Sequence, residues 1–224
     1  MRRFIVFLLV AVVLTGLLVA GCARTQQPAP APDTGQNQVP GGQVPGGQVP
    51  APAGEPALKD YFPLTVGSAW YYRGEGNEYA SFSRRVVFAE GSRAQVREDT
   101  GGTVAASVFE TTGEAVTRVY FQGEAYEDKN LLGAQPNDST VLLKKPLAVG
   151  TSWQPPRGGK REIVEVNAAV TVPAGSFERL VKVKISDENS TMYEYYGRGV
   201  GLVKREFISG ETRVTSSLES YVLK

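Results

Sequence analysis

Apolar and polar residues alternate along most of the chain, and this repeat of two constrains the fold more than any other feature of the sequence. From Arg179 to Ser186, for example, Val181, Val183 and Ile185 alternate with lysines. A second run, from Lys160 to Val172, places Val164, Val166, Ala168, Val170 and Val172 at alternate positions. Successive side chains of a β-strand point to opposite faces, so this pattern predicts strands with one buried face.

Similar runs recur along residues 58–224, rich in aromatic and β-branched residues and separated by Gly, Asn and Asp. They predict further strands at 69–73, 81–88, 93–98, 104–110, 115–122, 140–143, 192–196, 201–207 and 213–223. No stretch of useful length has an apolar face that repeats every 3.6 residues, so we expect little helix beyond the N-terminal segment. We therefore expect an all-β domain of about 10 mostly antiparallel strands, either one large curved, half-barrel-like sheet or a two-sheet sandwich.

The first 22 residues have a different character. Arg2 and Arg3 precede an uncharged apolar run over residues 4–20, which is marginal for the roughly 20 residues needed to cross a bilayer core. The run ends in Val19-Ala20-Gly21-Cys22. This order of an aliphatic residue, two small residues and a cysteine resembles the bacterial lipoprotein signal.

The resemblance implies that residues 1–21 are a signal peptide and that Cys22 becomes the lipid-bearing N-terminus. In that family the cysteine sulfur receives a diacylglyceryl group before cleavage, and palmitate is expected there as well. Two or more acyl chains give stable anchoring. We expect an extracytoplasmic protein held by lipid in the outer leaflet of the cell membrane, or in the outer membrane of a two-membrane organism.

Residues 22–57 form a segment rich in Pro, Gly, Gln and Ala, with almost no large apolar residue. Within it the unit Gln-Val-Pro-Gly-Gly occurs twice from Gln38, and a third copy begins at Gln48. Such a composition cannot build a core, so we expect a disordered tether. A proline-rich ligand for a partner protein is the alternative, but the repeats lack Pro-x-x-Pro spacing. The globular domain is then expected over residues 58–224.

The composition argues against several classes of function. Lys plus Arg (24) nearly equals Asp plus Glu (23), so nothing indicates nucleic acid as a partner. The chain has no histidine, and its single cysteine, Cys22, is expected to carry lipid. Serine and cysteine nucleophiles therefore lack their usual base, and imidazole or thiolate metal sites cannot form. We expect no catalytic residue, no metal and no cofactor.

Carboxylates are the remaining candidates for catalysis or calcium binding. They form two clusters in the sequence, one of Glu124, Glu127 and Asp128 and one of Glu75 and Glu78. Paired carboxylates could support a hydrolase. Neither cluster has the spacing of a strong calcium loop, so we interpret both as charged loop tips.

The two tryptophans share a local motif. Pro63-Leu64-x-Val66-Gly67-x-x-Trp70 is repeated as Pro146-Leu147-x-Val149-Gly150-x-x-Trp153. Proline, glycine and tryptophan in this order are typical of a tight corner that leads into a strand. The repeat indicates either two related halves or a good corner that arose twice. Trp70 and Trp153 could also form a ligand platform.

Three tyrosines are the other candidate ligand-binding residues. Tyr193, Tyr195 and Tyr196 lie in one predicted strand and could stack on sugars. Packing within the sheet is the alternative interpretation. The basic stretch Arg157-Gly158-Gly159-Lys160-Arg161 follows two prolines, and we interpret it as a solvated loop.

Three turn and strand patterns together resemble those of bacterial envelope lipoproteins of uncharacterised function. They are Tyr61-Phe62-Pro63-Leu64 through Trp70, Val172-Pro173-Ala174-Gly175-Ser176-Phe177, and Tyr195-Tyr196 through Gly199-Val200-Gly201-Leu202-Val203-Lys204. The resemblance implies a β-rich extracytoplasmic domain and supplies no catalytic residue. The glycines at 197–201 precede a strand rather than a helix, so they predict a turn and no phosphate site.

These observations favour a lipid-anchored, non-enzymatic protein that binds or scaffolds through a β-sheet surface. The sharper hypothesis is that an apolar concave face holds a lipid or another hydrophobic ligand. A module that binds carbohydrate or protein at the cell wall is the alternative, and a carboxylate-based hydrolase is the third possibility. The expected partners are the membrane, through Cys22, and a lipid, a glycan or an envelope protein.

Overall fold

The computed structural model describes residues 56–224, which belong to one compact unit of the chain. The predictions for the signal peptide, for Cys22 and for most of the tether lie outside these residues. Within them, no helix has the length and apolar character needed to span a membrane.

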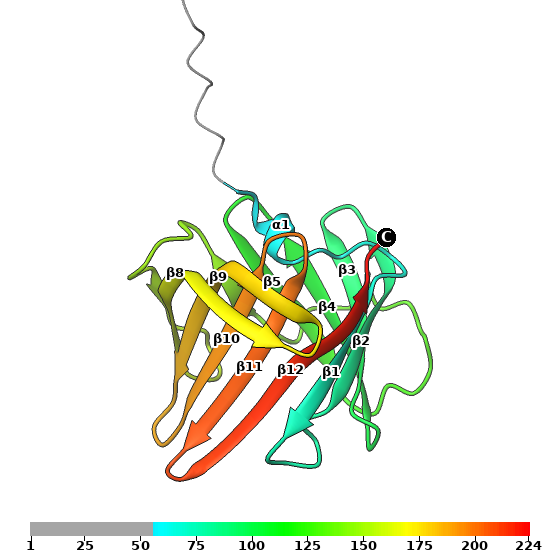
Figure 1. Cartoon of the computed structure of the whole chain (residues 1–224). Coiled ribbons are helices and arrows are strands. Elements are labelled where there is room, and N and C mark those ends of the chain that lie inside the picture. Colours follow the sequence, from blue (N-terminus) through cyan, green and yellow to red (C-terminus); the bar gives the residue numbers. More distant parts are fainter. Residues whose placement is uncertain (1–55) are drawn as a thin grey trace, which may run out of the picture. The chain divides into compact units, whose positions relative to one another are not determined.

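The sheet elements follow one another with hardly any helix between them (Figure 1). In order they are α1 (Leu58–Tyr61), β1 (Ala69–Glu75), β2 (Phe82–Glu90), β3 (Arg93–Asp99), β4 (Val104–Thr111), β5 (Ala115–Gln122), β6 (Thr140–Lys144), β7 (Ser152–Trp153), β8 (Lys160–Val172), β9 (Gly175–Ser186), β10 (Thr191–Gly197), β11 (Gly201–Ser209) and β12 (Thr212–Val222). Every strand predicted from the alternation is present. The four residues of α1 are the one α-helix in the described part of the chain.

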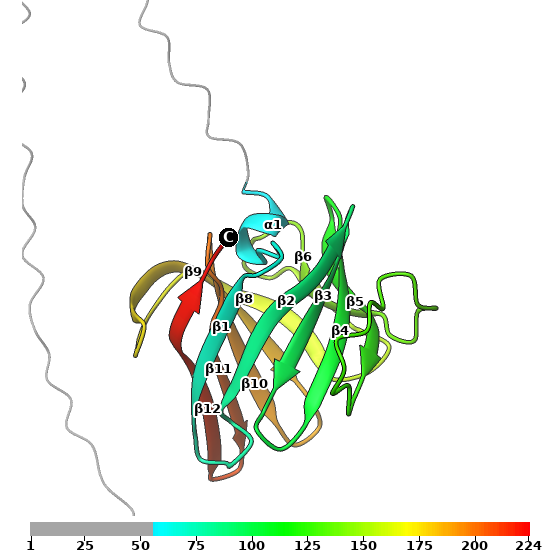
Figure 2. The same ribbon diagram turned by 90° about the vertical axis from the view of Figure 1, so that its right-hand side faces the viewer.

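All 12 strands belong to one antiparallel sheet, so the prediction of a single curved, half-barrel-like sheet is confirmed. The order is β6-β5-β4-β3-β2-β1-β12-β11-β10-β9-β8-β7. Neighbours in sequence are therefore neighbours in the sheet, with the first strand also joined to the last. The exception is the pair β6 and β7, which are the two edges of the sheet. The sheet curves strongly (Figure 2), and a hydrogen bond between Trp153 and Val141 shows that its two edges come together. We name the gap between them the seam.

A tryptophan side chain bridges the seam. The Nε1 of Trp153, in β7, donates a hydrogen bond of 2.9 Å to the carbonyl oxygen of Val141, in β6. This side-chain hydrogen bond joins the two edges where backbone pairing between strands is interrupted. The sheet remains open, as a half-barrel, between these two edges.

The two Pro-Leu-x-Val-Gly-x-x-Trp corners have the same backbone geometry. Gly67 and Gly150 both have a positive φ, 88° and 90°, which glycine adopts without steric cost. The residue after each glycine closes the turn with a backbone hydrogen bond, 3.0 Å at Ser68 and 3.1 Å at Thr151. The first corner leads into β1–β6 and the second into β7–β12. The repeat in the sequence therefore marks the start of two six-stranded halves.

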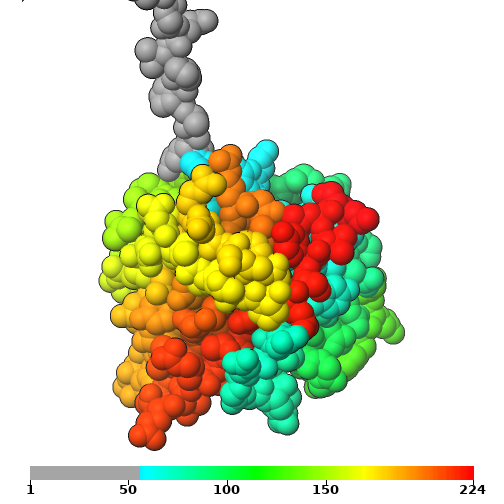
Figure 3. All heavy atoms as spheres, in the orientation of Figure 1, coloured from blue at the N-terminus to red at the C-terminus, as the bar shows by residue number. Residues whose placement is uncertain are grey.

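The β8–β9 hairpin forms a second layer over half of the sheet. Its outer part folds across the outer face of β10–β12 (Figures 1 and 3), and the N–H of Ala174 at its tip donates to the carbonyl of Leu218 at 3.0 Å. Three register shifts between Ile163 and Val170 allow this bend. The apolar face predicted for residues 164–172 is present, because Val164, Val166, Ala168, Val170 and Val172 are buried or partly buried and the residues between them are exposed.

The other half of the sheet is covered on its outside by the loop between β5 and β6. Leu131 and Leu132 of this loop pack on Val108 of β4. Gln95 is buried beneath the loop, where its side chain accepts a 2.7 Å bond from the N–H of Leu131 and donates a 2.9 Å bond to the carbonyl of Lys129. Both halves thus have a covered outer face, and the inner, concave face is left for the candidate site.

Candidate functional site

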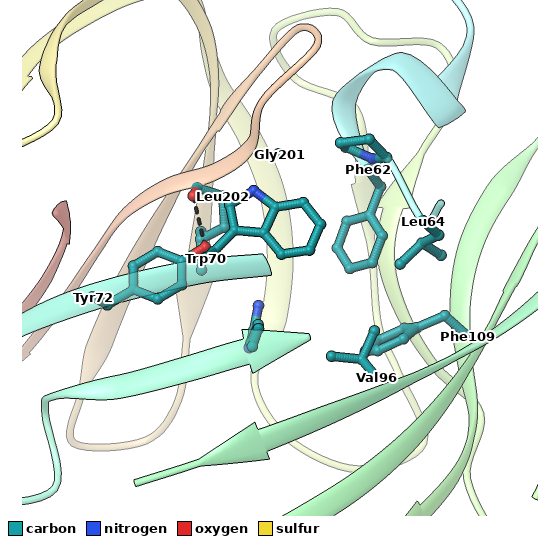
Figure 4. Close-up of a pocket in the computed structure, with 10 residues that line it drawn as sticks. Phe62, Leu64, Trp70, Tyr72, Val96, Phe109, Gly201 and Leu202 are labelled. Atoms are coloured by element: carbon teal, nitrogen blue, oxygen red, sulfur yellow. Dashed lines mark hydrogen bonds between the residues drawn. The ribbon is translucent and has the colours of Figure 1, made fainter. Parts of the chain in front are cut away.

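One end of the concave face is apolar and filled by the chain itself. The segment after α1 inserts Phe62, whose ring lies 5.1 Å from that of Phe109 and 6.2 Å from that of Tyr196 (centroid to centroid). Trp70 and Tyr72 of β1 complete this end (Figure 4). The remaining cavity is about 30 Å³, roughly the space of one water molecule. We name this region the apolar end.

Farther along the same face, ionisable side chains replace the aromatic ones. Directly opposed residues of an antiparallel pair share a face of the sheet. Arg84 of β2 opposes Glu98 of β3, and Glu194 of β10 opposes Arg205 of β11. Arg161, at the start of β8, reaches across β9 to Glu194. The sheet curvature brings these strands together around one cavity.

We name this space, of about 180 Å³, the arginine cavity. It is lined by Arg84, Val96, Glu98, Ala105, Ser107, Phe109, Arg118, Phe121, Thr140, Leu142, Arg161, Glu194 and Arg205. Four arginines thus face two glutamates. The carboxylate of Asp138 adds a third negative charge, because it accepts a bond of 2.5 Å from the Nε of Arg118.

Glu194 is the most enclosed charge of the site. Its side chain is 4% exposed and accepts bonds from Arg161 (3.0 Å), Arg205 (3.1 and 3.2 Å) and the hydroxyl of Tyr196 (2.8 Å). Burial alone would raise its pKa, but the two guanidiniums and these hydrogen bonds outweigh burial and lower the pKa of Glu194 to about 2. The side chain is therefore a permanent carboxylate at any ordinary pH.

Arg84 and Glu98 form the second pair, which is partly buried, with 2.6 Å between Arg84 Nε and Glu98 Oε2. The pKa of Glu98 is lowered because the charges of Arg84 and Arg205, together with the Arg84 hydrogen bond, outweigh the opposing effect of burial. The guanidiniums of Arg84 and Arg205 also lie over the ring of Phe82, at 5.1 and 5.5 Å from its centroid. Both arginines are thus held in place before any ligand arrives.

Hydrogen-bond donors outnumber free acceptors in the arginine cavity. A guanidinium has five N–H donors. Within residues 56–224, Arg84 donates through Nε and Arg205 through Nε, with its Nη2 in an ion pair to the same carboxylate. Arg161 donates through Nη1 to Glu194 and also interacts with the hydroxyl of Tyr196. Several N–H groups of these guanidiniums are left over. Both carboxylates of the cavity are already engaged. The arrangement therefore suits a ligand rich in acceptors, such as an anion.

The two predicted tryptophans lie apart and are both buried. Trp70 is at the apolar end, where its Nε1 donates to the carbonyl of Val200 at 2.7 Å, whereas Trp153 bridges the seam. They do not form one platform, although Trp70 lines the small cavity of the apolar end. A ligand role for either residue stays a prediction.

The three predicted tyrosines are divided between the two faces of the sheet. Tyr196 is fully buried on the concave face, and its pKa is raised by burial and by the charge of Glu194. Tyr193 and Tyr195 point to the other face, where Lys182 Nζ lies 4.6 and 5.1 Å from their ring centroids. The tyrosine hydroxyl at 195 donates to Glu206 at 2.9 Å. No single stacking surface brings all three together, and their binding role stays a prediction.

The carboxylate clusters lie outside the concave face, on exposed loops and, for Glu75, at the end of β1. Glu124, Glu127, Glu75 and Glu78 are exposed, and Asp128 pairs with Arg85 at 3.1 Å and with Arg97 at 3.4 Å. In the described part of the chain no three such residues converge in the manner of a metal site. Asp128 holds the β5–β6 loop against β2 and β3.

The interpretation of residues 157–161 as a solvated loop is wrong for its last two positions. Lys160 and Arg161 begin β8, and Arg161 turns into the arginine cavity because it shares the face of Ile163. The sequence carried a signal for such residues. In two strands a charged residue has apolar residues two positions before and two positions after it, so that all three share one face of the strand. These segments are Phe82-x-Arg84-x-Val86 and Met192-x-Glu194-x-Tyr196. That pattern predicts a charge on a buried face.

Comparison with known proteins gives two similar crystal structures. One is an exported protein of Bacteroides fragilis, provisionally named as such, with a YmcC-like fold: identity is 17%, the TM-score is 0.46, and the match covers 72% of this chain and 98% of that one. The other, provisionally named a lipoprotein, is from Parabacteroides distasonis, with 18% identity, a TM-score of 0.43 and the same coverage. No protein-family model and no curated protein sequence matches the chain. Because both TM-scores are below 0.5, the function has to be argued from this chain's own residues.

Proposed function

We propose that this chain is a lipid-anchored extracytoplasmic protein that binds a small anionic ligand in its arginine cavity and does not convert it chemically. The observation that carries the proposal is the surplus of guanidinium N–H groups in a cavity whose carboxylates are already engaged. Charge-assisted hydrogen bonds of this kind are roughly twice as strong as neutral ones. The cavity volume, about 180 Å³, suits a small polar molecule.

The geometry favours an anion over the hydrophobic ligand expected from the alternating strands. The apolar part of the concave face is occupied by Phe62 and Leu64, which pack on the core. A lipid chain would have to displace them. The open volume instead lies where Arg84, Arg161 and Arg205 face inward.

Binding without conversion is supported by the state of the ionisable groups. The carboxylates of Glu98 and Glu194 are ion-paired, and their pKa values are lowered. Neither is suited to take up a proton near neutral pH, as a general base must. The sequence contains no histidine to replace them.

Anchoring through Cys22 rests on the lipoprotein signal and is tested separately from binding. Cells that express the chain are fed an alkyne analogue of palmitate, and the membrane and soluble fractions are compared. The wild-type chain is expected to carry the label and to sediment with membranes. Cys22→Ser is expected to lose the label and to leave the membrane fraction, and retention of the label in this variant would contradict the anchor.

Anion binding is tested by calorimetry on the mature chain in detergent, with citrate, succinate and inorganic phosphate as probes. The double variant Arg84→Gln/Glu98→Gln removes both charges of one partly buried pair and leaves the net charge unchanged. Its matched control, Arg73→Gln/Glu219→Gln, does the same to an exposed pair between β1 and β12. We expect the first variant to bind at least about 10-fold more weakly, or about 1.4 kcal/mol, and the control to bind as wild type. Equal binding by both variants, or no binding of any probe to the wild type, would refute the proposal.

A further inference from the structure

A second hollow continues from the arginine cavity toward the loops at the far end of β8–β11. Its volume is about 370 Å³, and it shares Arg118, Thr140 and Arg161 with the arginine cavity. The two spaces are therefore continuous past these three side chains. We name the second hollow the outer groove.

The floor of the outer groove is apolar for three consecutive strands. Ile185 of β9, Met192 of β10 and Phe207 of β11 oppose one another in the sheet and so share the concave face with Arg161. This row lies two residues beyond the Glu194–Arg205 row, which corresponds to a step of about 7 Å along the strands. Arg161 opposes Ile185 in this row, so the apolar side chains begin directly beside a guanidinium of the arginine cavity.

Arg157 lies at the outer side of this apolar floor. It lines the groove from the loop between β7 and β8. Asp187 also lines the groove, and Asp138 lies nearby but is engaged by Arg118. Among the ion pairs within residues 56–224 none includes Arg157, so its charge is available to a ligand in the groove.

The loop that carries Arg157 is held against the sheet by a glycine. A Cβ at Gly159 would lie 2.3 Å from the carbonyl oxygen of Ser186, so only glycine allows this approach. The neighbouring Gly158 has a φ of 84°, which also favours glycine. The Arg-Gly-Gly sequence at 157–159 therefore holds the guanidinium of Arg157 close to the end of β9.

We infer that the ligand is an elongated dianion with an acidic group at each end of a short apolar stem, and this inference rests on the proposed anion site. One acidic group enters the arginine cavity, the stem lies over Ile185, Met192 and Phe207, and the second acidic group reaches Arg157. The placement of the cations supports two acidic groups, because arginines lie both in the arginine cavity and, through Arg157, beside the apolar row of the outer groove. The five arginines of the two spaces face Glu98, Glu194, Asp138 and Asp187, and three of these four carboxylates are already paired with arginines.

The test is a calorimetric series on the mature chain in detergent. The probes are the dicarboxylates succinate, adipate, suberate and sebacate, with the monocarboxylates butyrate, hexanoate, octanoate and decanoate as controls of equal length. We expect a dicarboxylate to bind more tightly than the monocarboxylate of equal length only when its stem is long enough to span the apolar row. Arg157→Gln is then expected to weaken the best long dicarboxylate by at least about 5-fold, which is about 1 kcal/mol, and to leave succinate unchanged.

Arg179→Gln, which removes an exposed arginine from the β8–β9 hairpin, serves as the matched control and is expected to bind every probe as wild type does. Equal affinity of short and long dicarboxylates, or equal affinity of wild type and Arg157→Gln for all of them, would overturn this inference. If the short acids still respond to Arg84→Gln/Glu98→Gln, the proposed function survives that outcome. Failure of every probe, phosphate and citrate included, would refute both.

Discussion

The two ends of the concave face are built from the same alternating strands, yet they are stabilised in opposite ways. At the apolar end, Phe62 fills the space between β4 and β10 and leaves a cavity of about 30 Å³. At the arginine cavity, the chain leaves about 180 Å³ open and satisfies its charges with ion pairs. The apolar end is thus closed by packing. The arginine cavity stays open, and its guanidiniums keep N–H groups that are free to bind a ligand.

The largest effect is expected from removing the shared carboxylate of the arginine cavity. Glu194→Ala leaves Arg161 and Arg205 without their shared counter-charge. The free energy of unfolding is expected to fall by roughly 3 to 5 kcal/mol, as is typical when one partner of a buried ion pair is removed. Urea denaturation measures this loss. Glu219→Ala, which breaks the exposed pair with Arg73, is the control and is expected to cost less than about 1 kcal/mol. Similar costs for both would show that the arginine cavity does not depend on its buried charge.

A smaller loss is expected when the packing of the apolar end is removed. Phe62→Ala deletes the ring that contacts Phe109 and Tyr196, at a cost of about 3 kcal/mol. Denaturation measures the loss, and calorimetry with citrate shows whether the ends are independent. We expect citrate affinity to stay the same. A loss of citrate affinity in Phe62→Ala would show that anion binding in the arginine cavity depends on packing at the apolar end.

Acid should weaken the charged end selectively. Because the folded-state pKa of Glu194 lies near 2, below its unfolded value near 4.5, its contribution is complete above about pH 5 and disappears as the pH falls toward 2. The free energy of unfolding is therefore expected to fall over this range by about 2 to 3 kcal/mol from this group alone. Urea denaturation between pH 6 and 3, in roughly half-unit steps, measures the slope. Glu194→Gln should show a shallower slope, and an unchanged slope would contradict the assignment.

The smallest effect is expected at the seam. Trp153→Phe keeps the ring and removes the Nε1 bond to Val141, which typically contributes about 1 kcal/mol. Hydrogen exchange of the β6 amides is expected to accelerate in this variant. Trp70→Phe, which loses the bond to Val200 at the apolar end, is the comparison and should leave β6 exchange unchanged. Equal acceleration in both would mean that Trp153 does not hold the seam.

The fold was largely predictable because alternation is a local property of the sequence. The turn at Pro173 and Ala174 and the two tryptophan corners were expected and are present. The arginine cavity was not predicted, because it depends on pairing between strands far apart in the chain. Arg84 and Glu194 each sit between apolar residues in the same phase, which indicates a buried charge, but nothing local says that Arg161 and Arg205 meet the same carboxylate. The filling of the apolar end by Phe62 likewise depends on where α1 docks.

The valine pattern of β8 predicted the side of the strand that is buried. The even-numbered residues from Val164 to Val172 are buried or partly buried, whereas the odd-numbered residues between them are exposed. The register shifts between β8 and β9 therefore bend the hairpin without disturbing this alternation. What the valine pattern did not predict is that Ile163, just before it and in the opposite phase, is fully buried.

An open sheet usually exposes two edges to other chains, and unpaired edges are sites where strands of separate molecules join and aggregate. Here the edge strands are short, five residues in β6 and two in β7, and they face each other across the seam. A neighbouring molecule therefore finds little free backbone with which to extend the sheet. For molecules crowded on one membrane surface, as the proposed lipid anchor implies, such short edges favour remaining separate.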